Sequence, residues 1–372
     1  MSVRCNYKIF DFSFTLSADS SRVIRLFDLV YRNFRQKSSP MPYFSFEVFT
    51  NNGKRGFPHL EVEGKMYPFH GFSSVESQCF KLITDEIYKK ISSHVWMHGG
   101  GVAFQNKGMM VCGDSGAGKT SLILKLLSYG FKFLSDEVIP IDKKTGMMIP
   151  FPRSVSLRPE ARTLLEKEFS LFRELEFVNL SGHKYFGNPS FLKSKRVSQP
   201  VFPEYFVYLK KPASVSREEM NIDTIIENKG EDFLTHLETI KGVTILKSIR
   251  KDNYIYLMTR IKRNASVIKQ YLKVYEKYKK HIVHTEKKRE KGIKFNQNPR
   301  IKPLSVHDIG LFMMKQSKEN LIEHNFHEER FKSLGAYWLD LLEEMNLERV
   351  KGFEVQVGRM ENTVELIQNL VR

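Results

Sequence analysis

Hydrophobic and polar positions near the start of the chain follow the periods of strands and helices in turn. Residues 10–16 alternate Phe or Leu with Asp, Ser and Thr, which is the period of a half-buried strand. An apolar stripe over 23–34 and a capping-box spacing at the start of 73–91 predict two helices, with two short strands between them. The pattern predicts a small α+β N-terminal domain, residues 1–92, to which we assign no chemistry.

From residue 93 the pattern changes to short buried runs separated by turns. Residues 96–104 and 109–112 are typical of two strands joined by a tight turn. If they pair as a hairpin, the numbers of facing residues sum to roughly 213, which places His98 beside Ser115. The alternative is a core histidine that caps a strand end. A helix is expected at 120–129, where a glycine ends it.

The rest of the pattern predicts an α/β core with an insertion. Strands are expected at 131–142, 205–209, 243–249, 254–258 and 353–358, and helices at 231–239, 305–324, 328–344 and 361–372. A segment rich in Gly, Asn, Pro and Lys at 181–194 is expected to be a mobile loop over the site. The predicted domains are the N-terminal domain (1–92), a central core (93–260), a basic helical insertion (261–349) and a C-terminal strand and helix (350–372) that complete the core.

The composition is that of an ordinary globular protein. The chain has 372 residues, of which 41% are hydrophobic and 27% are charged. No run approaches the ~18 apolar residues that span a bilayer, and Asp11 interrupts the apolar start, so neither a membrane helix nor a signal peptide is expected. Three cysteines without Cys-x-x-Cys spacing argue against a disulfide framework and a zinc site. We therefore expect a soluble, cytoplasmic protein.

The formal net charge of +17 is concentrated in one part of the chain. Residues 261–303 hold fourteen Lys or Arg and three Glu, and Val267, Tyr271, Val274 and Tyr278 form one apolar face of a basic helix there. Such a run is commonly a solvated face. The alternative is a surface for an anionic partner, an acidic peptide or protein in preference to nucleic acid.

One motif carries explicit chemistry. It fits the pattern G-x-x-x-x-G-K-[ST] and reads Gly113-Asp114-Ser115-Gly116-Ala117-Gly118-Lys119-Thr120. A buried strand precedes it and a helix follows, the context in which backbone N–H groups at a helix N-terminus receive a polyphosphate. We expect Lys119 to reach the outer phosphates, Thr120 to hold Mg²⁺, and the nucleotide site to extend to Ser121. The alternative is a chance glycine-rich turn before a helix.

An acidic pair, Asp136 and Glu137, ends the strand that follows this helix. The helix rises ~18 Å at 1.5 Å per residue, and a seven-residue strand returns ~23 Å at 3.3 Å per residue. The pair is therefore expected near Lys119, with one carboxylate facing a metal and the other an acceptor; two solvated carboxylates are the alternative. Arg153 and Arg158 are candidate contacts to a phosphate or an acidic substrate; the alternative is that they are solvated, as arginines in a basic protein usually are.

Together these parts resemble the HPr kinase/phosphorylase family. The resemblance rests on His98-Gly99, the hairpin, the motif at 113–120, the helix ending in a glycine, and the segment Leu134-Ser135-Asp136-Glu137. It covers about residues 93–160 and implies a PEP-carboxykinase-like P-loop core with a mixed sheet.

The resemblance also implies roles for individual residues. The motif would bind the phosphates of ATP, and Asp136 would be the general base that accepts the proton of an acceptor serine. Glu137 would lie near Mg²⁺ with Thr120 and Asp136, Lys119 would act on the phosphates, and His98 would orient the carboxylate or the phosphate. A carboxylate of ordinary pKa is ionised at neutral pH and can accept a proton without tuning.

Three departures set the chain apart from the family. The usual Asp-Asp pair is Asp136-Glu137 here, no segment matches the one linked with reverse phosphorolysis, and the N-terminal block is shorter than the family's regulatory domain. The basic insertion is not a family feature either. The chain is therefore interpreted as a divergent member, such as a serine kinase that acts on biosynthetic precursor peptides.

The leading hypothesis is an ATP- and Mg²⁺-dependent kinase of a serine in an acidic or serine-containing peptide or protein. A kinase of a small hydroxylated metabolite and a non-catalytic, nucleotide-dependent binding protein are the alternatives. Nucleic acid and membrane partners are not expected. The acceptor, ATP against GTP, the reverse reaction and homo-oligomer formation stay open at this point.

Overall fold

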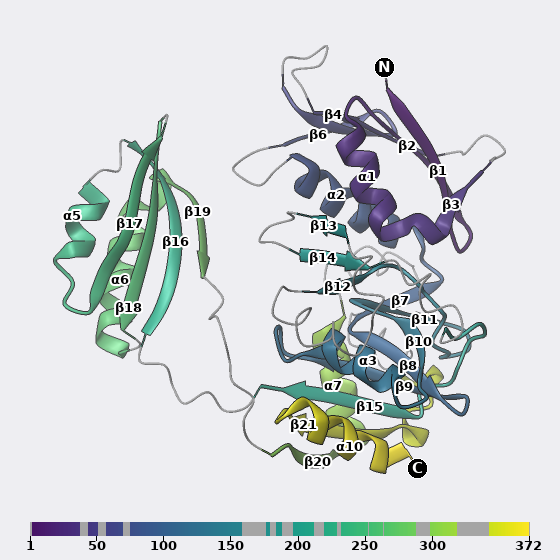
Figure 1. Cartoon of the computed structure of the whole chain (residues 1–372). Helices are drawn as coiled ribbons and strands as arrows, with labels where there is room; N and C mark the ends of the chain where they lie inside the picture. The colour runs from purple at the N-terminus through teal and green to yellow at the C-terminus, as the bar shows by residue number, and fades with distance from the viewer. Residues whose placement is uncertain are drawn as a thin grey trace. The chain divides into compact units, whose positions relative to one another are not determined.

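The computed structural model describes residues 2–37, 44–50, 57–69, 75–157, 176–178, 184–187, 196–211, 219–228, 232–251, 253–262, 264–287, 298–317 and 342–371. The chain divides into two compact units (Figure 1). Unit 1 comprises residues 1–211 and 296–372, and unit 2 comprises residues 212–295.

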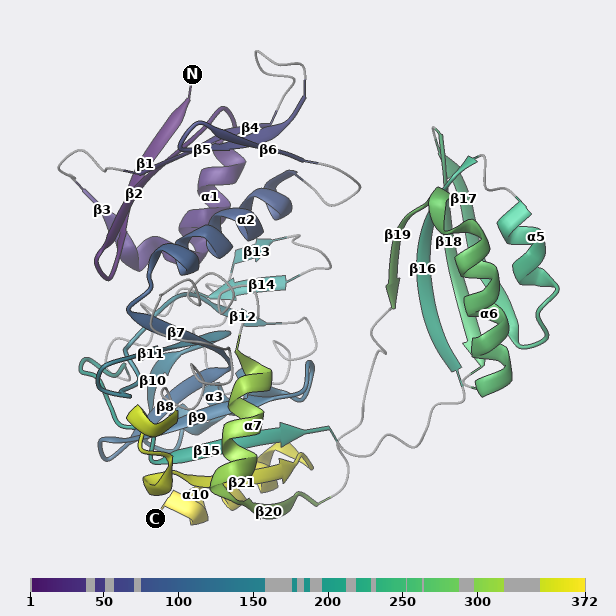
Figure 2. The ribbon, with the colours of Figure 1, turned by 180° about the vertical axis from the view of Figure 1, so that it is seen from behind.

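Unit 1 begins with a six-stranded sheet. Its order is β3 (Arg35–Gln36), β1 (Val3–Ile9), β2 (Phe12–Ala18), β4 (Ser45–Phe49), β5 (His59–Val62) and β6 (Lys65–Pro68). Helices α1 (Ser21–Tyr31) and α2 (Val75–Lys90) pack on one face of it (Figures 1 and 2). Alternate strand residues such as Phe14, Leu16 and Phe46 are fully buried against these helices, as the period-2 pattern requires.

The strand predicted at 10–16 begins later than expected, at Phe12, because Phe10 lies in a turn. Phe10 has a φ of 53° and lies between β1 and β2. Its ring stacks on His94 at a centroid distance of 4.3 Å, which draws it out of the alternation of the sheet. The apolar run therefore spans a turn, a feature that periodicity alone does not reveal.

A second six-stranded sheet forms the centre of unit 1. Its order is β10 (Lys132–Ser135), β8 (Gly100–Phe104), β9 (Lys107–Gly113), β15 (Tyr205–Lys210), β21 (Lys351–Gln356) and β20 (Arg300–Leu304). The strands β9, β15 and β21 run parallel to one another. The pairs β8 with β9, β10 with β8 and β20 with β21 are antiparallel, so the sheet is mixed. The late strand and helix therefore return to this sheet, as the sequence predicted.

Helices cover the central sheet. α3 (Lys119–Leu127) packs on β8, β9 and β10, and contacts α10 (Met360–Val371). α7 (Val306–Gln316) packs through Ile309 and Met313 against residues of β9 and β15 that include Cys112 and Tyr208. The expectation of an α/β fold with a mixed sheet is confirmed for the described residues.

Two small sheets complete unit 1. β7 (His94–His98) pairs antiparallel with β11 (Val138–Asp142), and β12 (Val155–Leu157), β14 (Lys184–Gly187) and β13 (Glu176–Val178) form a three-stranded sheet. The predicted strand 96–104 is thus divided at Gly99, and its two parts enter different sheets. Glycine at the start of β8 permits this packing, because a Cβ on Gly100 would lie 2.0 Å from the Ile123 side chain of α3.

Unit 2 is an antiparallel sheet with two helices on one face. The sheet order is β17 (Val243–Lys251), β18 (Tyr254–Lys262), β16 (Glu219–Glu227) and β19 (Ile282–Lys287). Helices α5 (Asp232–Glu238) and α6 (Ala265–Tyr278) bury their apolar sides on it (Figure 2). Along β18 the residues Ile255, Leu257 and Ile261 point into this core.

The insertion predicted at 261–349 differs from unit 2 in extent and in content. Unit 2 begins at residue 212 and contains the two strands that were assigned to the core. Its basic helix has the predicted apolar face, with Val267, Tyr271 and Tyr278 buried, but four strands accompany it. The helix predicted at 305–324 is seen as α7 in unit 1, and most of the one predicted at 328–344 lies outside the described residues.

Phe151 packs at the centre of the aromatic core of unit 1. Its side chain is fully buried, with ring centroids of Phe34 and Trp96 at 5.0 and 5.5 Å. We expect Phe151→Ala to lower the free energy of unfolding by about 3–5 kcal/mol, because a buried ring is replaced by a cavity. Urea unfolding followed by tryptophan fluorescence measures this.

The matched control is Phe57→Ala, whose ring is 38% exposed and whose loss is expected to cost no more than about 0.5 kcal/mol. Equal effects of the two substitutions would contradict the assignment of Phe151 to the core.

Candidate functional site

The glycine-rich loop 113–118 connects β9 to α3. Three of its glycines have positive φ angles, 136° at Gly113, 81° at Gly116 and 89° at Gly118. Such angles are easily reached by glycine alone, so the loop's shape depends on these residues. Ser115 and Gly116 are exposed, whereas Ala117 is buried under them. The loop thereby presents backbone to solvent at the N-terminus of α3, which carries a partial positive charge.

Gly113 cannot carry a side chain. A Cβ there would lie 2.2 Å from the carbonyl oxygen of Leu209 in the neighbouring strand β15. The next residue extends this contact, because the Asp114 N–H donates to the same oxygen at 3.0 Å. The start of the loop is therefore fixed against the central sheet.

Lys119 folds back over the loop. Its Nζ donates to the carbonyl oxygens of Gly113 at 2.9 Å and Asp114 at 3.3 Å. The pKa of this amine is lowered, chiefly because partial burial disfavours its charged form. The ammonium thus lies within the turn of the loop, where an incoming anion can exchange with these carbonyl contacts.

Tyr208 holds the carboxylate of Asp114. Its hydroxyl donates to Asp114 Oδ1 at 3.2 Å, and its ring stacks on Phe312 of α7 at 4.1 Å. Burial first, and then the charge of Asp114, raise the pKa of Tyr208 to about 12. The sequence identified Asp114 but not Tyr208, because a tyrosine in an apolar strand gives no signal of a polar role.

Asp136 is brought to the first turn of α3. Its side chain is 1% exposed; Oδ1 accepts from the Thr120 hydroxyl at 2.9 Å and Oδ2 from the Ser156 N–H at 3.1 Å. Burial, followed by the charge of Glu137, raises the pKa of Asp136 to about 6. The expected ordinary pKa is therefore wrong, because the carboxylate lies in the interior. Ser156 was not foreseen as a partner, since it follows a proline-rich stretch.

The acidic pair does not end one continuous strand. β10 ends at Ser135 and β11 begins at Val138, so Asp136 and Glu137 lie where the chain passes from one sheet to another. Glu137 has a φ of 69°, a left-handed angle that is uncommon outside glycine. The expected alternation of the two side chains along a strand therefore does not apply.

His98 lies beside Glu137 and not opposite Ser115. The hairpin pairs Gly100 with Val111, two residues out of the predicted register, and His98 belongs to β7, where it faces Val138. Its Nδ1 contacts the Glu137 carbonyl oxygen at 3.1 Å. The structure joins His98 to the acidic pair through the backbone.

The two arginines proposed as substrate contacts have different outcomes. Arg153 is 7% exposed, donates to the Tyr88 hydroxyl at 2.9 Å and lies over the ring of Tyr31, so it is an interior residue and does not face a substrate. Arg158 lies outside the described residues, as does most of the predicted loop 181–194.

The residues at this site fit a magnesium ion held together with a phosphate. Within the described ranges no three His, Cys, Asp or Glu side chains gather as a metal site. Mg²⁺ is usually held by one or two carboxylates with substrate phosphates and waters. The hydroxyl of Thr120 and the carboxylate of Asp136, 2.9 Å apart at the start of α3, are oxygen ligands of that kind.

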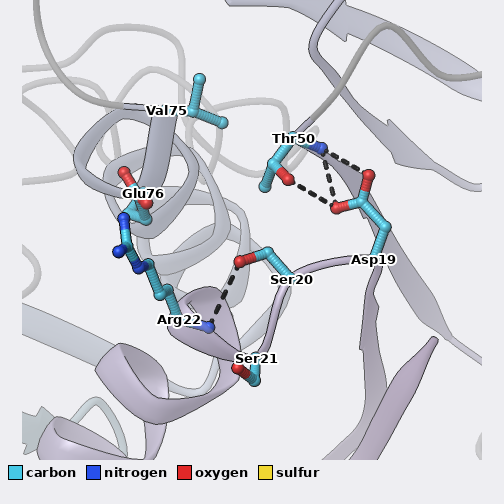
Figure 3. Close-up of a pocket in the computed structure, with 7 residues that line it drawn as sticks. All are labelled: Asp19, Ser20, Ser21, Arg22, Thr50, Val75 and Glu76. Atoms are coloured by element: carbon cyan, nitrogen blue, oxygen red, sulfur yellow. Dashed lines mark hydrogen bonds between the residues drawn. The ribbon is translucent and has the colours of Figure 1, made fainter. Parts of the chain in front are cut away.

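A separate polar pocket lies near the starts of α1 and α2 (Figure 3). Its volume is about 640 Å³, and its lining residues are Asp19, Ser20, Ser21, Arg22, Thr50, Val75 and Glu76. Thr50 donates to the Asp19 carboxylate from its N–H at 2.9 Å and from its hydroxyl at 2.8 Å, which joins the segment before α1 to the end of β4. None of the predicted site residues lines this pocket.

Known proteins show little similarity to this chain. No family model and no curated protein matches the chain. Among solved structures it has a weak, partial likeness to the Hpr(Ser) kinase/phosphatase from Coxiella burnetii, with 17% identity, a TM-score of 0.21, and coverage of 32% of this chain and 68% of that chain. A likeness this slight carries no argument about function. In the described part of the chain, no helix has the length and apolar character needed to cross a bilayer.

The raised pKa of Asp136 makes the stability of the free protein depend on pH. Because the folded-state pKa, about 6, lies above the usual 3.8, folding disfavours the ionised form. The cost is absent below about pH 4, grows as the pH rises from 4 to 6, and is complete above that range.

We expect Asp136→Asn to remove this cost. An asparagine can accept from the Ser156 N–H and donate to the Thr120 hydroxyl, so both contacts are retained. At pH 8, without nucleotide or divalent cations, the variant's free energy of unfolding should exceed that of the wild type by up to about 3 kcal/mol. The difference should shrink at pH 5, as urea unfolding at the two values would measure.

Asp142→Asn is the control, and we expect it to change the free energy of unfolding in the opposite direction. Burial alone would raise the pKa of Asp142, but hydrogen bonds from Thr145 and Lys144 outweigh burial and lower it. This variant should be less stable than the wild type at pH 8. A loss of stability in both variants would contradict the buried charge of Asp136.

Proposed function

We propose that the chain is an ATP- and Mg²⁺-dependent kinase that transfers the γ-phosphate to a serine hydroxyl of a peptide or protein. One observation supports this above the others: the buried carboxylate of Asp136 meets the Thr120 hydroxyl at 2.9 Å, directly after the glycine-rich loop. A carboxylate, a hydroxyl, a lysine and a loop of exposed backbone thus converge at one helix N-terminus. These are the parts that phosphoryl transfer requires.

The proposed core is of the P-loop type, similar to that of HPr kinases. In this proposal the N–H groups of Ser115, Gly116 and Gly118 and the N-terminus of α3 receive the phosphates, because the N–H groups of Asp114 and Ala117 already donate to carbonyl oxygens of the protein. Lys119 exchanges its contacts with the Gly113 and Asp114 carbonyls for phosphate oxygens. The nucleotide site extends through Thr120 to Ser121, both half-buried in the first turn of the helix.

Asp136 acts as the general base. It accepts the proton of the acceptor serine hydroxyl while the serine oxygen attacks the γ-phosphorus and the bond to ADP breaks. Without a bound metal the pKa of Asp136 is about 6, so the carboxylate is largely ionised at neutral pH and can take a proton. Bound Mg²⁺ would neutralise charge on the phosphates, with Thr120, Asp136 and Glu137 as its protein ligands.

His98 acts indirectly in this proposal. Its contact with the Glu137 carbonyl oxygen holds the backbone that carries the acidic pair, at a residue with a left-handed φ. We assign it the positioning of that pair. A cytoplasmic location, where ATP is available, belongs to the same proposal.

A kinase of a small hydroxylated metabolite is the second candidate, since the same catalytic groups would serve it. Acceptors of both kinds, offered with ATP and Mg²⁺ and followed by mass spectrometry of the products, separate the two. Nucleotide binding without ADP formation under all conditions would favour a non-catalytic binding protein.

Asp136→Asn tests the catalytic assignment. We expect phosphate transfer to fall by about 10²–10⁴-fold, because the general base is lost, while the affinity for nucleotide measured without Mg²⁺ stays within about threefold. Intact-mass measurement of the acceptor gives the rate, and titration with a fluorescent ATP analogue gives the affinity.

The control for this test is Asp142→Asn, the same substitution at a carboxylate of β11 whose contacts are with Thr145 and Lys144. It should transfer phosphate at the wild-type rate. Unchanged transfer in Asp136→Asn would remove this residue from the mechanism.

Lys119→Met tests the phosphate-binding loop. The substitution keeps the length and apolar stem of the side chain and removes its charge, so we expect the Kd for ATP to rise at least tenfold. Lys132→Met, at an exposed position of β10, is the control and should bind ATP as the wild type does. Equal affinity of the two variants would argue against phosphate binding at this loop.

A further inference from the structure

One edge of the unit 2 sheet has the features of a peptide-binding strand. β17, nine residues long, ends the sheet order and pairs with β18 alone among the described strands. In an antiparallel edge strand, alternate N–H and C=O groups point away from the sheet and can pair with an added strand.

β17 also exposes apolar side chains. Leu246 is 38% exposed and Ile249 is 43% exposed, on a strand that helix α5 contacts but that pairs with no described strand at its outer edge. A bulge between Ile245 and Lys247 sets Leu246 outside the regular pairing with β18. Exposed apolar residues on an edge strand promote pairing with another chain, and natural proteins usually avoid them unless the edge is used.

The same edge is basic. Lys247 and Arg250 on β17 are exposed, as are Arg260 and Lys262 on the adjacent strand β18. The register places Lys247 opposite Met258 and Arg260 opposite Thr244, so these two cations share the face of the sheet that lies away from the core. Arg250 is opposite the buried Ile255 and lies on the other face. Unit 2 as a whole has nineteen Lys or Arg and eleven Asp or Glu. An anionic partner is favoured here.

These features together favour an acidic, extended peptide. A second copy of the chain would bring the lysines and arginines of two β17 strands against one another, which like charges oppose. A nucleic acid would meet the cations but would not pair with the edge backbone. An extended peptide with acidic and apolar residues can pair with the edge backbone, pack on the apolar side chains and neutralise the basic ones.

Unit 2 starts close to the candidate site along the chain. β15 ends at Lys210, directly after Leu209, whose carbonyl oxygen accepts from the Asp114 N–H of the loop, and unit 2 follows from residue 212. A peptide held by unit 2 is therefore tethered to the part of the chain that carries the loop. Tethering raises the effective concentration of such a peptide at the site.

We propose that β17 binds an acidic peptide segment of the phosphate acceptor as an additional strand, with apolar contacts to Leu246 and Ile249 and ionic contacts to Lys247 and Lys262. The identity of this peptide as part of a kinase substrate rests on the proposed function. The binding itself does not, and it is measurable without nucleotide.

The test uses the full chain and a fluorescein-labelled dodecapeptide of alternating Glu and Val, followed by fluorescence anisotropy. We expect saturable binding that weakens with salt. The same peptide with Lys in place of Glu should bind at least tenfold more weakly. Two further versions are N-methylated at every Val or at every Glu. One of the two should lose binding, because in an added strand only one set of N–H groups faces β17.

Substitutions locate the surface. The double change Leu246→Ser and Ile249→Ser, and separately Lys247→Glu, should each raise the Kd at least fivefold. Val283→Ser, at a 42% exposed position on the opposite edge strand β19, and Lys273→Glu, on the exposed side of α6, are the matched controls and should leave the Kd unchanged. Thermal unfolding checks that each variant is folded.

Equal weakening by the β17 and control substitutions would overturn the proposal, as would unchanged binding by both N-methylated peptides. Tighter binding of a dT20 oligonucleotide that the Leu246 and Ile249 changes do not affect, with no binding of the acidic peptide, would identify a nucleic-acid surface instead. If peptide binding behaves as expected but no acceptor is ever phosphorylated, the docking edge stands and the kinase proposal fails.

Discussion

The structure of unit 1 depends on how one buried carboxylate is accommodated. Asp136 is ionisable, almost fully buried and adjacent to a second acid, a combination that is costly in the absence of partners. The Thr120 hydroxyl and the Ser156 N–H each donate to one of its oxygens. Three segments, the start of α3, the junction between β10 and β11, and the strand β12, therefore meet at a single side chain. Such a cost is commonly retained where chemistry needs a tuned group.

The segment that leads into β12 also connects the N-terminal domain to the central sheet. The chain just before β12 is bound to the end of α1, because Ser154 donates from its N–H to the Val30 carbonyl at 3.0 Å and from its hydroxyl to the Leu29 carbonyl. Phe151 lies in the aromatic core that α1 and α2 share with β7. Displacement of α1 would therefore act on the backbone that holds Asp136, although the N-terminal sheet carries none of the catalytic residues that we assign.

Unit 2 has its own core and its own sheet, and no residue of the candidate catalytic site comes from it. Its helices cover one face of the sheet, while β17 offers apolar and basic side chains at an edge. A separate compact unit can acquire a binding surface without disturbing the central sheet, because it has a hydrophobic core of its own. Recognition and chemistry are thus assigned to different parts of the chain.

Local features of the sequence determined the glycine-rich loop, the helix after it and the return of an acidic pair to its start, because these depend on short-range geometry and on residue types with few alternatives. The apolar face of the basic helix was foreseen for the same reason.

Tertiary structure decided the other features of the fold and of the candidate site. Strand pairing put His98 in β7 and shifted the hairpin by two residues, since the three glycines at 99–101 allow the chain to change sheets where a period-2 pattern predicts continuity. Burial raised the pKa of Asp136 and placed Arg153 in the interior, because both follow from distant segments that pack around them. The extent of unit 2 was likewise decided by pairing between β16 and β18, whose partners lie 27 to 43 residues apart in the chain.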